Sequence, residues 1–115
     1  MARIKPAESG TRPTILVRAA REMKPHARRA AELLKALANE QRLMILCHLV
    51  LQPLSVGQLN ERVALSQSAL SQHLAVLRDC GIVRTERESQ TVWYSLPPGI
   101  VTRLLALLHD EFCKR

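Results

Sequence analysis

Aromatic residues are scarce in this chain of 115 residues, which has one tryptophan, one tyrosine and one phenylalanine. Modules that bind RNA or single-stranded nucleic acid stack bases on aromatic side chains that are interleaved with basic ones. Trp93, Tyr94 and Phe112 are too few for such a platform. No uninterrupted apolar run approaches the length of a membrane span either, so we expect no membrane partner.

Cysteine is also infrequent, and nothing in the chain resembles a secretory signal. The apolar stretch Ile15-Leu16-Val17 is short and is surrounded by charged residues. We therefore expect a cytoplasmic location. In that reducing compartment Cys47, Cys80 and Cys113 should be thiols at rest rather than members of structural disulfides.

Basic residues, in contrast, are abundant, and the formal net charge is +7. The chain is long enough for one domain with one hydrophobic core. A small basic domain favours a polyanionic partner, most often nucleic acid. The alternative is a basic protein whose charge serves only its solubility.

The stretch from Leu65 to Asp79 predicts a DNA recognition helix. Ser66 suits the N-cap position, because its hydroxyl can accept a free backbone N–H of the first turn. Leucines at positions 70, 74 and 77 have helical spacing and form one apolar stripe. The opposite face carries short, neutral hydrogen-bonding side chains, and glutamine can pair with adenine in the major groove. These predicted DNA-contacting residues are Gln67, Ser68, Ser71 and Gln72.

Three more helices are expected before this stretch. The first runs from Pro25 to Leu37, and the second from Glu40 to about Leu51 behind an Asn39 cap. The second is apolar nearly all round, which is typical of a central, buried helix. Ser55 is expected to cap a short helix from Val56 to about Val63, and a brief turn joins that helix to the recognition helix. This order is a helix-turn-helix.

Two short strands with a basic character follow the recognition helix. They are expected at Ile82–Arg87 and Gln90–Leu96, with Glu88-Ser89 at the tip and Gly81 as the preceding helix cap. A basic hairpin in this place is a wing that can contact phosphate or the minor groove. Its predicted DNA-contacting residues are Arg84, Arg87 and Gln90, and one arginine could instead pair with Glu86 or Glu88.

A last helix is expected from about Ile100 to Cys113. Its leucines form a stripe that is too wide for so small a core, and such a stripe usually packs against a second copy of the chain. The sequence thus predicts a mainly helical, homodimeric fold with a small β-hairpin, namely a winged helix-turn-helix with five helices. Residues 25–115 form this DNA-binding and dimerisation domain. Residues 1–24 form a basic arm, either disordered or partly helical and laid on a partner subunit.

Two runs of sequence carry a resemblance to a known family. Residues 33–43 (LLKALANEQRL) and 65–74 (LSQSALSQHL) are similar to the ArsR/SmtB family of bacterial repressors, and the likeness extends from about residue 27 to 113. The resemblance implies a homodimer whose interface is formed by the first and last helices of the domain. It also implies binding to double-stranded operator DNA without effector, and release when an effector is sensed.

The effector is suggested by the cysteines. Metal sensors of this family carry a Cys-X-Cys pair at the start of the third helix, where this chain has no sulfur, or spaced ligands on the last helix, where it has only the adjacent His109, Asp110 and Glu111. Cys47 and Cys113 resemble the pair of the subgroup that senses reactive sulfur species or oxidants, of the BigR and SqrR type. The resemblance implies that the two thiols face each other and become joined by a disulfide or a short polysulfide bridge.

Other interpretations of these thiols and histidines stay open at this point. A lone buried cysteine is usually a small apolar residue, and Cys80 at a helix C-terminus gains no dipole that would activate it. Cys47, His48, His109 and Cys113 could hold zinc in a metal-responsive repressor. However, adjacent helical residues point about 100° apart, so Cys47 and His48 are poorly placed for one ion.

His73 lies between the polar and apolar faces of its helix. It could contact DNA, and we count it among the DNA-binding residues, or it could make a structural hydrogen bond. An enzyme is not expected, because a thiol enzyme built on Cys113 and His109 would stand at a chain end without oxyanion donors. No cofactor or metal is expected. An architectural DNA-binding protein that senses nothing is the remaining alternative.

Overall fold

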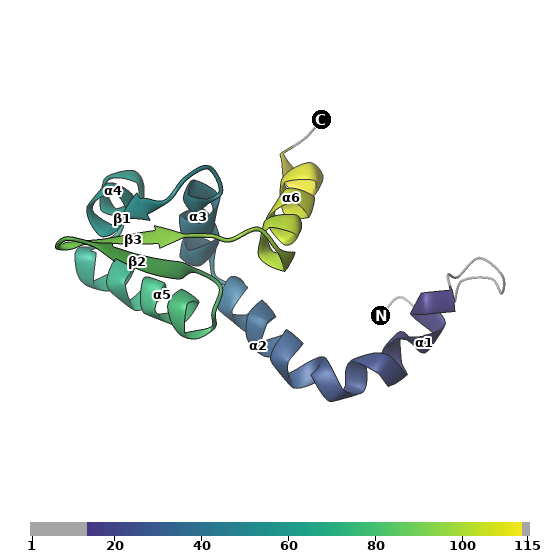
Figure 1. Cartoon of the computed structure of the whole chain (residues 1–115). Coiled ribbons are helices and arrows are strands. Elements are labelled where there is room, and N and C mark those ends of the chain that lie inside the picture. The colour runs from purple at the N-terminus through teal and green to yellow at the C-terminus, as the bar shows by residue number, and fades with distance from the viewer. Residues whose placement is uncertain (1–13, 114–115) are drawn as a thin grey trace. The chain divides into compact units, whose positions relative to one another are not determined.

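The computed structural model describes residues 14–113, and side chains from residue 18 onward (Figure 1). Contacts divide the chain into two units, residues 1–31 and 32–115. The described part of the first unit is helical: α1 (Thr14–Met23) leads through a 3-10 turn, η1 (Lys24–His26), into α2 (Ala27–Leu37), which crosses the division. Residues 1–13 of the predicted arm lie outside the described residues. The division between arm and domain at residue 24 stays a prediction.

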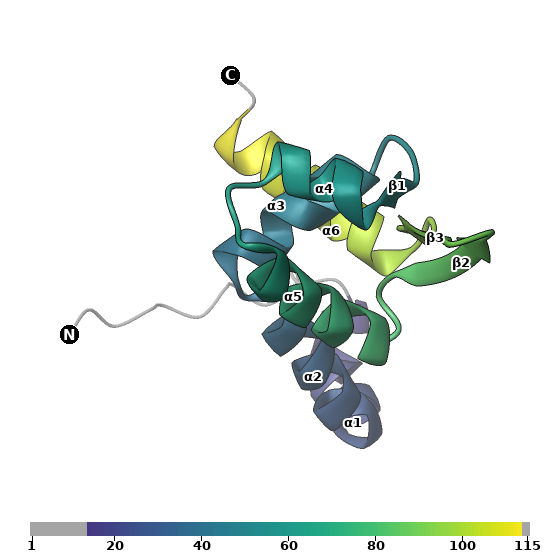
Figure 2. The same cartoon turned by 90° about the vertical axis from the view of Figure 1, so that its left-hand side faces the viewer.

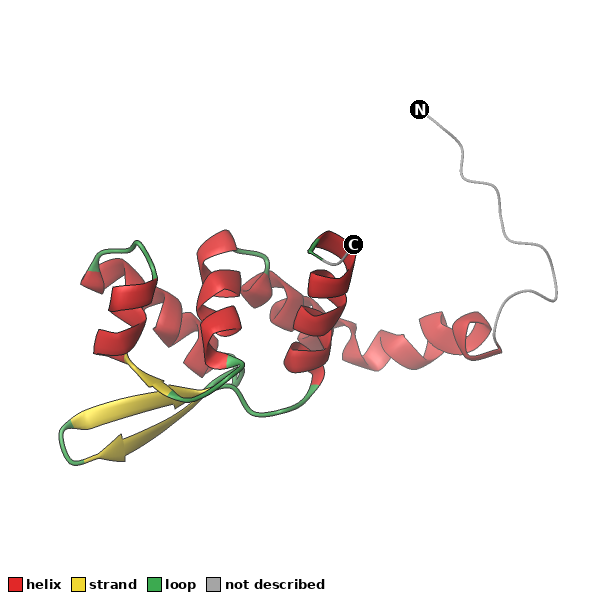
Figure 3. Cartoon of the chain, turned by 90° about the horizontal axis from the view of Figure 1, so that it is seen from above, coloured by secondary structure: helices red, strands yellow, loops and turns green. Residues whose placement is uncertain are grey.

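The second unit contains the helix-turn-helix and the wing. After α2 come α3 (Glu40–Leu49), β1 (Leu54–Ser55), α4 (Val56–Arg62), α5 (Gln67–Asp79), β2 (Arg84–Glu88), β3 (Thr91–Ser95) and α6 (Ile100–Phe112). The five helices α2 to α6 and the hairpin appear in the predicted order, so the predicted winged helix-turn-helix is confirmed. Figure 2 shows α4 and α5 one above the other, and Figure 3 shows the hairpin projecting from the helices of this unit.

Local side-chain bonds start three of these helices where the sequence predicts. The Asn39 side chain accepts the backbone N–H groups of residues 41 and 42 at 3.0 and 3.1 Å. Ser55 and Gln58 form a reciprocal capping box, and Ser66 Oγ accepts the N–H of Ala69 at 3.1 Å. Each bond satisfies a donor that a helix N-terminus would otherwise leave without a partner.

The strand ends differ from the sequence prediction. Ile82 and Val83 are not in the sheet, because their N–H groups donate to the carbonyl of Leu77 and wrap the end of α5. Gly81 permits this wrap, as its φ of 73° lies in the left-handed region that other residues avoid. The hairpin tip accordingly falls at residues 89–90, one residue later than expected, with Ser89 at φ 60°.

The sheet also has a third strand that the sequence analysis missed. Strand β1 pairs antiparallel with β3, through Leu54 opposite Tyr94 and Ser55 opposite Trp93, in the order β1-β3-β2. Two residues are too few for alternation to reveal a strand in the sequence. The pairing anchors the wing to the segment that leads into α4.

The core of the second unit lies between α3, α4, α5 and the sheet. Its eight most completely buried side chains are Ile45, Leu46, Leu49, Leu54, Leu59, Leu70, Leu74 and Leu77. The sequence predicted that helix α3 is buried nearly all round, and this prediction is wrong. The core is small and covers only one side of the helix. Met44, Cys47 and Val50 lie on the exposed side.

The bounds of two other helices are corrected. Helix α2 begins at Ala27 rather than Pro25, because Lys24–His26 form a 3-10 turn. Helix α3 ends at Leu49, and residues 50–51 form a turn before the Gln52-Pro53 break. Within the described residues, no helix is both long and apolar enough to span a membrane.

Candidate nucleic-acid interface and thiol pair

Helix α5 presents a polar face because its apolar stripe is fully buried. Leu70, Leu74 and Leu77 have exposed fractions of 0, 1 and 0%. This burial fixes the rotation of the helix about its axis, so the four predicted base-reading residues are exposed: Gln67, Ser68, Ser71 and Gln72. No charged side chain interrupts this face in the first two turns. The arrangement suits neutral hydrogen bonding to base edges in a major groove.

His73 makes a structural hydrogen bond. Its Nδ1 accepts a hydrogen bond from Arg42 Nε at 3.3 Å, and the imidazole is half-buried. The sequence left open a contact with DNA or a structural hydrogen bond for His73, and the structure contains the hydrogen bond. The imidazole's other nitrogen, Nε2, is the atom left for a contact with DNA.

Arg42 joins three helices, and the sequence analysis missed it. Besides His73 on α5, its guanidinium bonds the carbonyl of Ala36 on α2, with Nη1 donating at 3.0 Å. Arg42 itself lies in the first turn of α3. A cation directly before the apolar run at residues 43–47 was the available signal, since a half-buried cation needs polar partners. The contact gives α3 a direct polar link to the recognition helix.

The two arginines of the wing lie on opposite faces of the hairpin. All five side chains of β2 are exposed, with Arg84 paired opposite Ser95 and Arg87 opposite Val92. Successive strand residues alternate in direction, so Arg84 shares its face with Glu86 and Glu88, whereas Arg87 does not. Arg87 lies near the hairpin tip, beside the exposed Gln90. Arg87 is therefore the better placed of the two for a phosphate.

The alternative pairing of these arginines is not observed. Between residues 18 and 113, no carboxylate oxygen lies within 4.0 Å of a guanidinium nitrogen of Arg84 or Arg87. The described ion pairs are Arg18 with Glu22 and Arg78 with Asp79, both at the surface. Exposed pairs of this kind contribute little to stability.

Two thiols of the second unit interact electrostatically. Cys47 lies on α3, and Cys113 caps the C-terminus of α6, where its N–H donates to the His109 carbonyl at 2.8 Å. Partial burial raises the pKa of the Cys47 thiol, and the negative charge of the Cys113 thiolate raises that pKa further. Both thiols are unbridged and exposed to reagents. Helices α3 and α6 thus carry the two predicted sensing residues in one unit, within range of each other's charge.

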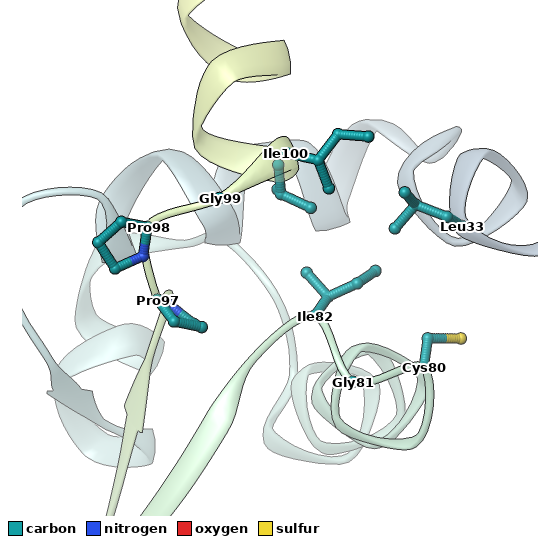
Figure 4. Close-up of a pocket in the computed structure, with 9 residues that line it drawn as sticks. Leu33, Cys80, Gly81, Ile82, Pro97, Pro98, Gly99 and Ile100 are labelled. Atoms are coloured by element: carbon teal, nitrogen blue, oxygen red, sulfur yellow. The ribbon is translucent and has the colours of Figure 1, made fainter. Parts of the chain in front are cut away.

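Cys80 lies elsewhere. It is the C-cap residue of α5, and Figure 4 shows it at the edge of a small pocket with Leu33, Ile82 and Ile100. Neither of the other cysteines lines this pocket. Cys80 is therefore set apart from the predicted sensing residues in this part of the described structure.

Comparisons with known proteins identify the family. Residues 39–85 match the model described as bacterial regulatory protein, arsR family. The transcriptional activator HlyU of Vibrio cholerae is 53% identical over 93 residues, which are 81% of this chain and 86% of HlyU. The chain belongs to the ArsR family. Its matched regions hold the helix-turn-helix described above, so it is a DNA-binding transcriptional regulator and not an enzyme.

Solved structures agree with this assignment. A reduced form of HlyU from Vibrio cholerae matches with a TM-score of 0.74 at 53% identity and covers 81% of this chain and 98% of that one. The transcriptional repressor BigR from Xylella fastidiosa matches with a TM-score of 0.75 at 38% identity and covers 84% and 98% of the two chains.

This ArsR-family chain shows no built metal site in its described part. From residue 18 to residue 113, no three or more His, Cys, Asp or Glu side chains are grouped so that they could hold an ion. The set Cys47, His48, His109 and Cys113 is therefore not assembled as a zinc site.

An apolar groove runs between α2 and α6 of this regulator. It is lined almost entirely by carbon atoms of Leu34, Leu37, Ala38, Leu43, Val101, Leu104, Leu105, Leu107 and Leu108. Leu34 and Leu107 are 56% and 63% exposed, which is much apolar surface for a folded protein to leave in water. These are the helices predicted to form the dimer interface.

The pKa of Cys47 gives a test of the thiol pair. Replacing Cys113 by serine removes a negative charge beside Cys47, so the pKa of Cys47 should fall, although burial should keep it above the ordinary value. We expect the pH dependence of Cys47 alkylation, followed by peptide mass mapping, to shift to lower pH in Cys113→Ser. Cys80→Ser is the matched control and should leave the profile unchanged. Identical profiles in all three proteins would show that the two thiols are not neighbours.

Proposed function

We propose that this regulator is a homodimeric transcriptional repressor that senses reactive sulfur species or oxidants through Cys47 and Cys113. The observation that supports the proposal is the placement of two free, exposed thiols in the same unit, one on α3 and one at the end of α6, where the charge of Cys113 helps to raise the pKa of Cys47. The descriptions of two similar proteins support the proposal. A relative from Xylella fastidiosa, 39% identical, is called a biofilm growth-associated repressor, which agrees with repression. One matched HlyU structure is described as reduced, which agrees with redox sensing.

In the proposed sensing reaction, hydrogen persulfide or a peroxide oxidises the two thiols by two electrons to a disulfide. With hydrogen persulfide (HSSH), one thiol takes a sulfur atom and becomes a persulfide while hydrogen sulfide leaves. The second thiol then attacks the inner sulfur of that persulfide, forms the protein disulfide, and releases a second molecule of hydrogen sulfide. If both thiols become persulfides first, loss of one hydrogen sulfide leaves a bridge of three sulfur atoms. A peroxide performs the same oxidation with water as its product.

The raised pKa of Cys47 affects the order of these steps. A thiolate is the attacking species in such exchanges, and a raised pKa keeps Cys47 protonated at neutral pH. In the proposed order Cys113 takes the sulfur atom first and Cys47 closes the bridge, because the burial that raises the pKa of Cys47 disfavours its thiolate. A plain disulfide requires Cα atoms within about 7 Å, whereas added sulfur spans more.

Helix α3 connects the thiol pair to the DNA-reading surface. It carries both Cys47 and Arg42, and Arg42 is bonded to His73 on α5 and to Ala36 on α2. A covalent link from α3 to α6 fixes the relative orientation of these two helices and so moves the Arg42 contacts. In a dimer, a small displacement of both recognition helices disturbs a strict half-site spacing. A coupling free energy of about 1–3 kcal/mol between bridge formation and DNA binding lowers the affinity for the operator by about 5–150-fold.

The groove between α2 and α6 supports the dimer. Its leucines are exposed in one protomer, and a two-fold partner would cover them with the same surface of its own. The two recognition helices would then lie about 34 Å apart, one turn of DNA, on a palindromic operator. We assign base contacts to the exposed face of α5 and phosphate or minor-groove contacts to Arg84, Arg87 and Gln90 of the wing.

Direct readout is tested by shortening one side chain of α5. Replacing Gln72 by alanine should weaken operator binding by about 1–3 kcal/mol and leave binding to random DNA unchanged, because glutamine reads a base edge and carries no charge. Gln52→Ala, an exposed glutamine in the loop after α3, is the matched control. Equal losses on operator and random duplexes, measured by fluorescence anisotropy, would contradict base reading by Gln72.

The switch is tested by comparing three serine variants after polysulfide treatment. Cys47→Ser and Cys113→Ser should stay on operator DNA, because neither can close the bridge, whereas Cys80→Ser should release DNA like the unmodified chain. Release is read by electrophoretic mobility shift, with dithiothreitol added to restore binding. Normal release from either of the first two variants would refute the mechanism. Release caused by zinc in full reductant would favour a metal sensor instead.

A further inference from the structure

The positive charge of this protein is concentrated in its first unit. Residues 1–31 contain eight lysines and arginines against two glutamates, a formal charge of +6. Residues 32–115 contain nine basic against eight acidic residues, a formal charge of +1. The unit that carries the recognition helix and the wing is therefore almost neutral. Attraction to phosphate supplies much of the affinity of a DNA-binding protein, and a nearly neutral unit provides little of it.

The described cations of the first unit are available to a partner. Arg21, Lys24, Arg28 and Arg29 are all exposed. From residue 18 onward, the structure shows no carboxylate within 4.0 Å of any of them, whereas Arg18 is paired with Glu22 at 3.2 Å. Residues 21, 24 and 28 recur at the spacing of one helical face, and the backbone is helical through them apart from the 3-10 turn. The segment therefore presents a row of unneutralised charge.

We propose that this basic segment, Arg21 to Arg29, is a second DNA-contacting surface, which binds phosphates of the duplex flanking the operator half-sites. Its partner is the sugar-phosphate backbone. Guanidinium and ammonium groups that have no neutral hydrogen-bonding side chains beside them recognise phosphate charge and not base sequence. The segment is continuous with α2. When the winged unit binds its operator, the cations of the segment are tethered to the same DNA, and their contact with its phosphates becomes an intramolecular step. The inference rests on DNA binding by the second unit and does not depend on the thiol switch.

A quadruple variant of the full chain tests the segment. Glutamine at positions 21, 24, 28 and 29 keeps good helix propensity and removes four charges. Each lost phosphate contact lowers the salt slope of log affinity by about 0.9, so the slope should fall by roughly two to four units per protomer, or about four to seven units for the DNA-bound dimer. The unmodified chain should also bind more tightly when the duplex is lengthened beyond the half-sites. The variant should lose that gain.

Single substitutions provide a matched pair. Arg28→Gln should lower the salt slope by about one unit per protomer, or about two units for the DNA-bound dimer, whereas Arg103→Gln, which removes an exposed charge from α6, should leave it unchanged. Circular dichroism and thermal unfolding confirm that each variant is folded. An unchanged slope in the folded quadruple variant, or an unchanged gain from flanking duplex, would overturn the proposal.

An anionic membrane is the competing partner for a basic helical segment. Vesicles of phosphatidylcholine with phosphatidylserine test it by co-sedimentation of the full chain. Vesicle binding that the quadruple substitution abolishes, with the DNA salt slope unaltered, would replace DNA by membrane. The thiol experiment remains separate, since release of operator after polysulfide should persist in the quadruple variant. The two experiments thus distinguish failure of the proposed DNA contact by the basic segment from failure of the proposed thiol switch.

Discussion

Helix α3 buries only one of its sides, and the remaining features of the regulator depend on that constraint. Ile45, Leu46 and Leu49 are at most 2% exposed, and burying each such side chain stabilises the fold by about 1.5–3 kcal/mol. This burial fixes the rotation of α3. With that rotation set, Cys47 lies on the exposed side of α3, and Arg42 reaches α5 and α2.

The same constraint limits what a bridge between the thiols can do. The burial energy of three aliphatic side chains exceeds the coupling of about 1–3 kcal/mol that a regulatory switch needs. Bridging should therefore shift or tilt α3 as a rigid element and should not unfold it. Close-packed cores respond by adopting alternative arrangements, not by continuous deformation. The hydrogen bond between Arg42 and His73 is long, at 3.3 Å, and is a contact that a small shift can break.

Local signals made much of this fold predictable from the sequence. Asn39, Ser55 and Ser66 start helices through bonds to residues two or three positions away, and Gly81 ends one by a backbone conformation that glycine adopts freely. The order of elements and the exposed polar face of α5 follow from such signals and from hydrophobic spacing. None of them requires knowledge of a distant partner.

The features that escaped prediction depend on distant partners. Strand β1 exists because β3 pairs with it, and the exposed side of α3 exists because the core is small. The Arg42–His73 bond joins residues 31 positions apart, and no local pattern specifies it. The thiol pair was suggested only through a family resemblance, since sequence spacing alone cannot bring Cys47 close to Cys113.

The central claim is that covalent joining of Cys47 to Cys113 causes release from DNA. Its most direct test is a titration of the reduced protein with polysulfide, in which intact mass and operator binding are measured on the same samples. The account predicts that the released fraction follows the fraction of protomers that have lost two hydrogens, with or without added sulfur, and that peptide mapping places the link between Cys47 and Cys113. Release before any such mass change, or full bridging with operator binding retained, would contradict it.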